Sequence, residues 1–248
     1  QGNFVAIGHP GQRYTGPSLI ARASQDRDPL ALDRQAQLAV QPHGHEPVDK
    51  ALRLVLIPVV DDLGKMPGAE WFPGARLNFA ENLLRYRDDQ TALIFKGEDR
   101  DSIRVTYAEL YEEVARVAKA LKQAGVRVGD RVVGFMPNMP QSVIAMLAAA
   151  SIGATWSSCS PDFGIKGVLD RFGQIEPKVL FTANGYSFKG KRIDSLVRIS
   201  DILKQLPSIE KVVVVPYTEQ RADISQVPNA VHYADFISSE ADLEIEFE

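Results

Sequence analysis

The apolar residues of this chain fall into two patterns that alternate along its length. Short continuous apolar runs are typical of strands that are covered on both faces of a parallel sheet. Longer stretches repeat their apolar positions with the period of one helix face. The predicted strands cover residues 91–96, 103–106, 131–135, 154–159, 178–182 and 211–216. The predicted helices cover residues 79–86, 107–124, 141–152, 164–175 and 195–206. The alternation of strand and helix predicts right-handed crossovers and an open, mostly parallel α/β sheet flanked by helices.

Two of the predicted helices begin with a capping signal. Asn78 precedes the helix at 79–86 and is a residue type that favours the N-cap position. Thr106 precedes the helix at 107–124, and Glu109 follows it at the spacing of a capping box. Both helix starts are therefore predicted from local hydrogen bonding as well as from periodicity.

The segments before the first parallel strand follow a different pattern. Strands 91–96 and 103–106 are separated by a short polar turn, which predicts an antiparallel hairpin. Before residue 57 the periodicity is weak, and it predicts only a short helix at 33–40 and a strand at 51–60.

A run of small residues at 146–175 contains the first candidate for a ligand-binding segment. It is predicted to hold the end of a helix, a strand, the loop Ser160-Pro161-Asp162-Phe163-Gly164 and the start of the next helix. Ligands of α/β proteins gather at the carboxyl ends of the parallel strands. The loop at 160–164 is placed at such an end.

A second candidate is the basic group Lys189-Gly190-Lys191-Arg192, which follows the predicted strand at 178–182. A glycine permits close approach of the backbone, and the three cationic side chains can pair with phosphate oxygens. A solvated loop in front of a helix explains the same residues. Spacing alone leaves both interpretations open.

Composition narrows the classes of function. The 248 residues carry a net charge of -4, which excludes a generally basic surface of the kind that coats nucleic acid. The single cysteine, Cys159, excludes an internal disulfide, and its apolar strand favours a buried inert thiol over a nucleophile. No apolar run approaches the length of a membrane span, and the first residues carry no basic leader. We expect a cytoplasmic protein without a membrane span or a nucleic-acid partner.

Motifs for a complete catalytic centre are missing from the sequence. Neither G-x-G-x-x-G nor G-x-x-x-x-G-K-[ST] occurs, so neither common phosphate-binding loop is present. His43-Gly44-His45 is more typical of a solvated loop than of a metal site. Taken residue by residue, the chain is an open parallel α/β domain and a poor candidate for a self-sufficient enzyme.

Four segments nevertheless resemble the AMP-forming acyl-CoA synthetases of the acyl-adenylate-forming superfamily. The segments V-T-Y-A-E-L at 105–110 and G-D-R-V-V-G-F-M-P-N at 129–138 match patterns found throughout that superfamily. The segments W-F-P-G-A-R-L-N-F-A-E-N-L-L at 71–84 and G-A-T-W-S-S-C-S-P-D-F-G at 153–164 resemble its acetoacetate branch.

The resemblance implies a domain organisation. Residues 57–248 are similar to the first α/β subdomain of such an enzyme. That subdomain is incomplete here, because the family's phosphate loop, later adenylate-binding motifs and C-terminal lid have no counterpart. Residues 1–56 match the family poorly and are expected to be either disordered or non-homologous.

The resemblance also implies a reaction. The whole enzyme would be an acid–thiol ligase that activates acetoacetate with ATP and Mg2+ to an acyl-adenylate and then transfers the acyl group to CoA. The expected partners are therefore acetoacetate, ATP and CoA. Catalytic residues are expected beyond residue 248, no residue is assigned to a metal, and this chain alone is expected to be inactive.

Carried over by position, the family's CoA contacts fall on the two candidate segments. In the loop they fall on Phe163 and Gly164. In the basic turn, which the resemblance implies to meet the phosphates of the CoA nucleotide, they fall on Phe188, Lys189, Gly190, Lys191 and Arg192. Phe188 stands where relatives often carry an arginine.

Two alternatives remain open. One is a non-enzymatic module that binds CoA or a nucleotide, which would explain the missing phosphate loop. The other is a related short-chain acyl-CoA synthetase that acts on acetate or propionate, because the acyl pocket of the family lies mostly outside the matching residues.

Overall fold

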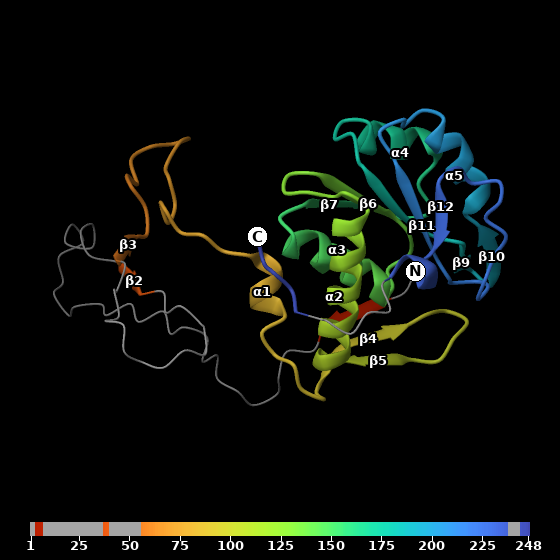
Figure 1. Ribbon diagram of the computed structural model, residues 1–248, viewed down its shortest axis with the longest axis horizontal. Coiled ribbons are helices and arrows are strands. Elements are labelled where there is room, and N and C mark those ends of the chain that lie inside the picture. Colours follow the sequence, from red (N-terminus) through yellow and green to blue (C-terminus); the bar gives the residue numbers. More distant parts are fainter. Residues whose placement is uncertain (1–2, 7–36, 40–55, 238–243) are drawn as a thin grey trace. The chain divides into compact units, whose positions relative to one another are not determined.

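The computed structural model describes residues 3–6, 37–39, 56–237 and 244–248, and side chains from residue 59 onward. The chain divides into two compact units. One consists of Gln1–Gly8 with Asn78–Glu248, and the other consists of His9–Leu77. The first unit contains the parallel sheet and its helices (Figure 1).

The centre of this unit is a five-stranded sheet in the order β12-β11-β8-β6-β7. Each hydrogen-bonded pair of neighbours in it is parallel. The strands are β6 (Arg131–Phe135), β7 (Thr155–Cys159), β8 (Val179–Ala183), β11 (Lys211–Val215) and β12 (Ala230–His232). The predicted open, mostly parallel sheet is confirmed.

Helices cover both faces of this sheet. The helices within the described residues are α1 (Phe79–Leu83), α2 (Tyr107–Gln123), α3 (Pro140–Ser151), α4 (Ile165–Phe172), α5 (Leu196–Leu203) and α6 (Tyr233–Phe236). Val132 and Phe181 join the core cluster of α2 and α3, whereas Val133 and Leu180 join the cluster of α4 and α5. Successive residues of one strand therefore enter opposite layers, as the pleat requires.

A glycine on β6 allows close packing between β6 and β7. Trp156 on β7 lies over Gly134 on β6, where an added Cβ would come within 2.7 Å of the indole ring. The ring also packs at 6.3 Å from that of Phe181, measured between ring centroids. A residue larger than glycine at position 134 would displace the tryptophan from the core.

An antiparallel sheet in the order β1-β4-β5 belongs to the same unit. It consists of β1 (Asn3–Ala6), β4 (Thr91–Lys96) and β5 (Ile103–Thr106). The predicted hairpin of β4 and β5 is confirmed, with a register shift between Thr91 and Leu93. The capping box at the start of α2 is also confirmed, because Thr106 and Glu109 exchange side-chain and backbone hydrogen bonds.

Several elements differ from the prediction. The basic group forms the predicted turn, but the antiparallel strands that it joins, β9 (Gly185–Phe188) and β10 (Lys191–Asp194), were not predicted. Strand β12 was not predicted. The predicted helix at 33–40 is wrong where it is described, because Gln37–Ala39 forms β2 and pairs with β3 (Leu56–Pro58). The rest of that segment and residues 51–55 lie outside the described residues.

The predicted boundary between residues 1–56 and 57–248 stays a prediction, because most of the first segment lies outside the described residues. Among the helices that the structure describes, none combines the length and the apolar character that a membrane crossing requires.

Asn78 joins three parts of the first unit. Its Oδ1 accepts the N–H groups of Ala80 and Glu81 at 2.9 and 3.2 Å, so the predicted cap of α1 is confirmed. Its Nδ2 donates to carbonyl oxygens at the end of α3 and at the last residue of the chain, those of Ala150, Ser151 and Glu248. One side chain therefore ties α1 to α3 and to the C-terminal segment.

Replacing Asn78 by alanine should lower the free energy of unfolding by about 1–2 kcal/mol, since it removes a helix cap and the donor to these carbonyl groups. Urea unfolding followed by circular dichroism measures the change. Asn82→Ala on the same helix is the matched control, because Asn82 is exposed and accepts only from the Arg85 side chain. An equal effect of both substitutions would contradict the role of Asn78.

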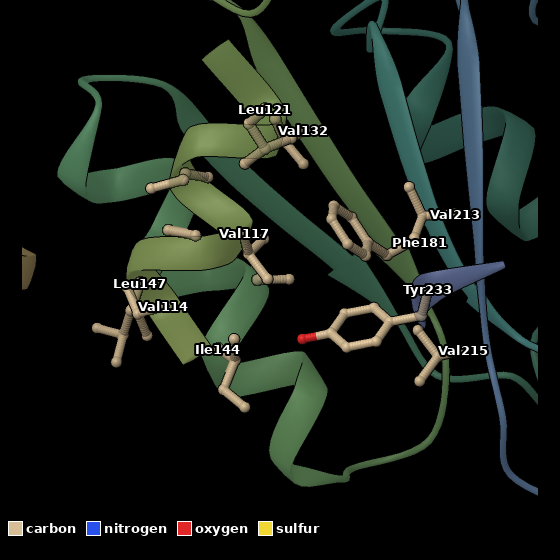
Figure 2. Close-up of a cluster of buried hydrophobic side chains, with 14 of the residues drawn as sticks. Val114, Val117, Leu121, Val132, Ile144, Leu147, Phe181, Val213, Val215 and Tyr233 are labelled. Atoms are coloured by element: carbon tan, nitrogen blue, oxygen red, sulfur yellow. The ribbon is translucent and has the colours of Figure 1, made fainter. Parts of the chain in front are cut away.

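Phe181 occupies the middle of the larger core cluster. The residue is fully buried, and Figure 2 shows its ring beside Val213 and facing the side chains of α2. The ring also meets Phe236 of α6 edge to face at 5.9 Å between centroids. It therefore connects the sheet with elements that are distant in the sequence.

Phe181→Ala should cost about 3–5 kcal/mol of unfolding free energy, because it removes a large buried ring and leaves a cavity. Val197→Ala provides the control, since Val197 on α5 is 70% exposed and should change stability by less than about 0.5 kcal/mol. Urea unfolding of each variant under the same conditions measures both free energies. A loss below 1 kcal/mol for Phe181→Ala, on the order of an ordinary surface substitution, would contradict its central place.

Candidate functional site

The candidate site lies at the edge of the sheet where the parallel strands end. Strands β6, β7 and β8 run in the same direction, so their carboxyl ends lie at one edge. The loop at 160–164 follows β7 directly, and the hairpin of β9 and β10 follows β8 after Asn184. Both predicted segments therefore leave the sheet at the edge where α/β proteins bind ligands.

The loop after β7 is held from both sides by arginines. Arg198 on α5 donates from Nη1 to the carbonyl oxygen of Pro161 at 3.1 Å. The guanidinium of Arg171 on α4 lies 4.2 Å from the centre of the Phe163 ring. Arg171 also reaches the sulfur of Cys159 at 3.9 Å. Phe163 is thus oriented by its neighbours while 36% of it stays exposed.

Cys159 itself is the buried thiol that the sequence predicts. It is 3% exposed and packs in the cluster of α4 and α5. This position agrees with a packing role.

The two glycines of the candidate site differ in what the backbone demands. Gly164 is the N-cap residue of α4 with φ at -66°, a conformation open to any residue, and a Cβ added there would meet nothing within 4 Å. Gly190 has φ at +72°, which strongly favours glycine. The backbone of the turn therefore explains the glycine at 190. At position 164 neither the backbone conformation nor the packing requires a glycine, and the absent side chain leaves open space.

The basic turn is a tight hairpin with left-handed backbone. Lys189 and Gly190 both have positive φ, at 50° and 72°, between the paired residues Phe188 and Lys191. Positive φ at both central residues is the geometry of a two-residue hairpin loop that matches the twist of the strands. The loop holds Lys189 and Lys191 exposed, and the Lys189 ammonium lies 5.3 Å from the centre of the Phe188 ring.

The cations of the turn differ in their partners. Arg192 forms an ion pair with Asp99, with 3.9 Å between Nε and Oδ2. Within the described part of the chain, no carboxylate lies at ion-pair distance from Lys189 or Lys191. The two lysines therefore keep their charge available for an anion.

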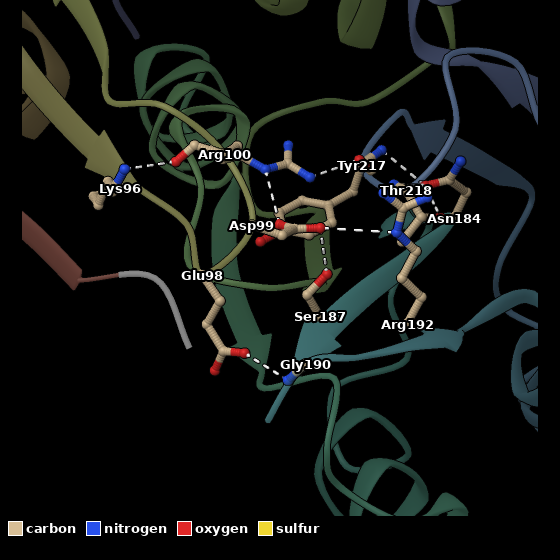
Figure 3. A network of polar contacts seen from close by, with 10 residues as sticks. All are labelled: Lys96, Glu98, Asp99, Arg100, Asn184, Ser187, Gly190, Arg192, Tyr217 and Thr218. Atoms are coloured by element: carbon tan, nitrogen blue, oxygen red, sulfur yellow. Dashed lines mark hydrogen bonds and ion pairs between the residues drawn. The ribbon is translucent and has the colours of Figure 1, made fainter.

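Asp99, on the turn between β4 and β5, is the centre of a polar network that sequence reasoning missed (Figure 3). Its Oδ2 accepts the Ser187 hydroxyl at 2.8 Å, and its Oδ1 lies 3.5 Å from Nε of Arg100. The hydrogen bond from Ser187, followed by the charge of Arg100, lowers the pKa of the Asp99 carboxyl. The sequence marks this residue only as part of a turn, so its partners could not be inferred.

Asn184 is a second structural residue of the site that the sequence did not reveal. Its Oδ1 accepts the backbone N–H groups of Tyr217 and Thr218 at 2.8 and 3.0 Å. Its Nδ2 donates to the carbonyl oxygen of Glu219 at 2.8 Å. These bonds fix the end of β8 to the segment after β11, directly before the hairpin begins (Figure 3).

The two candidate segments do not touch directly. Among the described residues, no hydrogen bond, ion pair or ring contact joins Phe163 or Gly164 to residues 188–192. Their connection is indirect, since the chain leaving β10 leads into α5, and Arg198 of that helix contacts Pro161.

The described residues do not bring together a group of three or more His, Cys, Asp or Glu side chains that could hold a metal ion.

Comparison with known proteins assigns the chain to a class. The family model described as AMP-binding enzyme matches residues 79–241, which include all strands of the parallel sheet and both candidate segments. The chain belongs to the AMP-binding enzyme family.

The chain is also similar to acetoacetyl-CoA synthetases. The chain is 47% identical over 187 residues to the acetoacetyl-CoA synthetase of Danio rerio, a match that covers 72% of this chain and 28% of the relative. It is 49% identical over 178 residues to the acetoacetyl-coenzyme A synthetase of Rhizobium meliloti, covering 71% of this chain and 27% of the relative. The structure of acetoacetyl-CoA synthetase from Streptomyces lividans is similar with a TM-score of 0.70 and 41% identity, over 77% of this chain and 29% of that one. The chain thus spans under a third of the length of these proteins.

Replacing Asp99 by asparagine should lower stability at neutral pH, and the difference from the parent chain should shrink under acid conditions. The folded-state pKa of Asp99 is lowered from its ordinary value of 3.8. A lowered pKa contributes stability that is present above the unfolded value and is lost as pH falls through the folded value. Urea titrations between neutral pH and strong acid measure the difference.

The matched control is Asp101→Asn, because Asp101 is exposed in the same turn. It should change stability by less than about 0.5 kcal/mol. A deficit of Asp99→Asn that persists at the lowest pH would exclude the charge of Asp99 as the cause.

Proposed function

We propose that this chain is part of an acid–thiol ligase that activates acetoacetate with ATP and transfers it to CoA. The observation that carries the proposal is the similarity to acetoacetyl-CoA synthetases, 47% identical over 187 residues in one case. The matching region includes the sheet edge from which the loop at 160–164 and the basic turn project. The segment W-S-S-C-S-P-D-F-G at 156–164, which is similar to the acetoacetate branch, contains the end of β7 and the loop with open space at Gly164.

The proposed reaction has two displacements. A carboxylate oxygen of acetoacetate attacks the α-phosphorus of ATP, forms the acyl-adenylate and releases pyrophosphate. The sulfur of CoA then attacks the acyl carbon, forms the thioester and releases AMP. Negative charge accumulates in both steps, so cationic groups must stabilise it. In the proposed enzyme, ATP is used with Mg2+, which polarises the phosphate oxygens when bound.

The part proposed for this chain is binding of CoA rather than chemistry. Lys189 and Lys191 are exposed cations without a carboxylate partner among the described residues, which suits the phosphates of the CoA nucleotide. Phe163 offers a partly exposed ring beside the open space at Gly164. We place the CoA-binding site in the two segments that hold these residues together with Phe188, Gly190 and Arg192.

Two further features belong to the proposal. A cytoplasmic location is supported by the single cysteine, which stays a free buried thiol. Small-molecule partners are supported over nucleic acid by the net charge of -4.

The chain should bind CoA and fail to catalyse the full reaction. Calorimetric titration of the 248-residue chain with CoA measures binding, and release of pyrophosphate in the presence of ATP, Mg2+, acetoacetate and CoA measures turnover. Dephospho-CoA, which lacks the 3′-phosphate, is the control ligand and should bind more weakly. Turnover at the rate of an ordinary enzyme would contradict the proposed division, and a folded chain without CoA affinity would contradict the assigned contacts.

A non-enzymatic module that binds CoA or a nucleotide is the second candidate, because the sequence contains no phosphate-binding loop. The DNA that follows the codon of Glu248 distinguishes the two. A phosphate loop encoded in frame favours the ligase, and a stop codon favours the module. Specificity for acetate or propionate would appear as exchange of pyrophosphate into ATP with those acids in the protein that carries the loop.

A further inference from the structure

The hairpin of β9 and β10 has two faces with different surroundings. Ser187 is paired with Arg192 across the two strands, and Phe188 is paired with Lys191. Successive residues of a strand point to opposite sides. Ser187 and Arg192 therefore share one face of the hairpin, and Phe188 and Lys191 share the other.

The first face is tied to the turn between β4 and β5. Asp99 accepts the hydroxyl of Ser187 at 2.8 Å and lies 3.9 Å from Nε of Arg192, so a single carboxylate contacts both strands of the hairpin (Figure 3). Ser187 is buried, whereas the Arg192 side chain is 71% exposed. The hydrogen bond from Ser187 is accordingly the stronger of the two contacts.

The backbone of the basic turn is tied to the same acidic segment. The N–H of Gly190 donates to Oε2 of Glu98 at 3.4 Å (Figure 3). The Gly190 amide therefore already has an acceptor. What the turn offers to a ligand is its side chains.

The second face carries the groups that suit the nucleotide end of CoA. Phe188 is 38% exposed, and the ammonium of Lys189 lies 5.3 Å from its ring centre. Lys191 lies on the same face as Phe188 by register. An exposed ring can stack with adenine, and lysines beside it can pair with phosphates.

We propose that Asp99 is a positioning residue for the basic turn, and that Arg192 acts on the ligand only through it. Phe188, Lys189 and Lys191 on the opposite face contact the nucleotide end of CoA. This inference rests on the proposed function and divides the basic group into one cation that holds the turn and two that receive phosphate. Arg192 and Lys191 are successive residues of β10, so their side chains lie on opposite faces of the hairpin. The side chain of Arg192 is on the face of Asp99, and that of Lys191 is on the other face.

Binding of CoA and dephospho-CoA to variants of the 248-residue chain tests the division. Lys191→Gln should weaken CoA about fivefold, because it removes one cation beside a phosphate in a solvated site. It should also reduce the preference for CoA over dephospho-CoA and the dependence on salt. Arg192→Gln should weaken CoA only about twofold, with that preference and the salt dependence unchanged.

Variants of Asp99 test the positioning role. Asp99→Ala should weaken CoA about threefold, because a displaced turn loses alignment of its contacts. Asp99→Asn keeps an oxygen that accepts from Ser187, so its affinity should lie closer to that of the parent chain. Adding Arg192→Gln to Asp99→Ala should cause no further loss, since the two residues form one unit.

Two results would overturn the inference. In the first, Arg192→Gln reduces the preference for CoA as much as Lys191→Gln does. In the second, Asp99→Ala tightens CoA binding, as expected if Asp99 only competes with the ligand for Arg192. Either result would place Arg192 in direct contact with phosphate.

A measurement without ligand separates this inference from the proposed function. The amide resonances of Gly190 and Lys191 should shift in Asp99→Ala and in Arg192→Gln and stay in place in the control Asp101→Asn. If the parent chain binds no CoA, the assigned contacts fail and the shifts alone decide the positioning role. Unchanged shifts in both variants would refute it.

Discussion

Strand β8 lies in the middle of the parallel sheet, and all of its residues are buried. Because Phe181 enters the layer of α2 and α3 and Leu180 enters the layer of α4 and α5, the strand cannot shift without opening both cores. Its end is fixed as well, since Asn184 binds the segment after β11 through three hydrogen bonds to backbone groups. The hairpin that follows is therefore attached to a strand that both cores and Asn184 hold in place. A fixed attachment favours ligand binding by the hairpin, because side chains that are already held in place lose less entropy when a ligand binds.

The parallel sheet could be predicted because strands that are buried on both faces have continuous apolar sequences. Runs such as Val212–Val215 contain no polar residue, and the helices α1 and α2, which precede these strands, begin with caps that need only neighbouring residues. Strands β9, β10 and β12 have no such continuous apolar run. The exposed residues of β10 are typical of a polar loop, and β12 is only three half-buried residues long. The short strand β2 was mistaken for a helix because pairing with β3 outweighs a weak periodicity.

The candidate site was predictable in its position but not in its construction. The rule that ligands bind where parallel strands end placed both segments correctly at the carboxyl edge of the sheet. The residues that hold those segments come from elsewhere in the chain. Asp99 lies 88 positions before its partner Ser187, and Arg198 lies 37 positions after Pro161. No local sequence pattern connects residues so far apart, so these contacts can be identified only in the folded structure.

Charge in the site depends on these contacts more than on composition. The chain is acidic overall, yet charges separated by more than about 8–10 Å are largely screened at physiological salt. A phosphate at the basic turn therefore responds to the nearest groups. Asp99 forms an ion pair with Arg192 on one face of the hairpin, and the hairpin itself separates that carboxylate from Lys191 on the other. An acidic residue on one face of the hairpin can thus hold the turn in place, and the lysines on the other face still attract an anion.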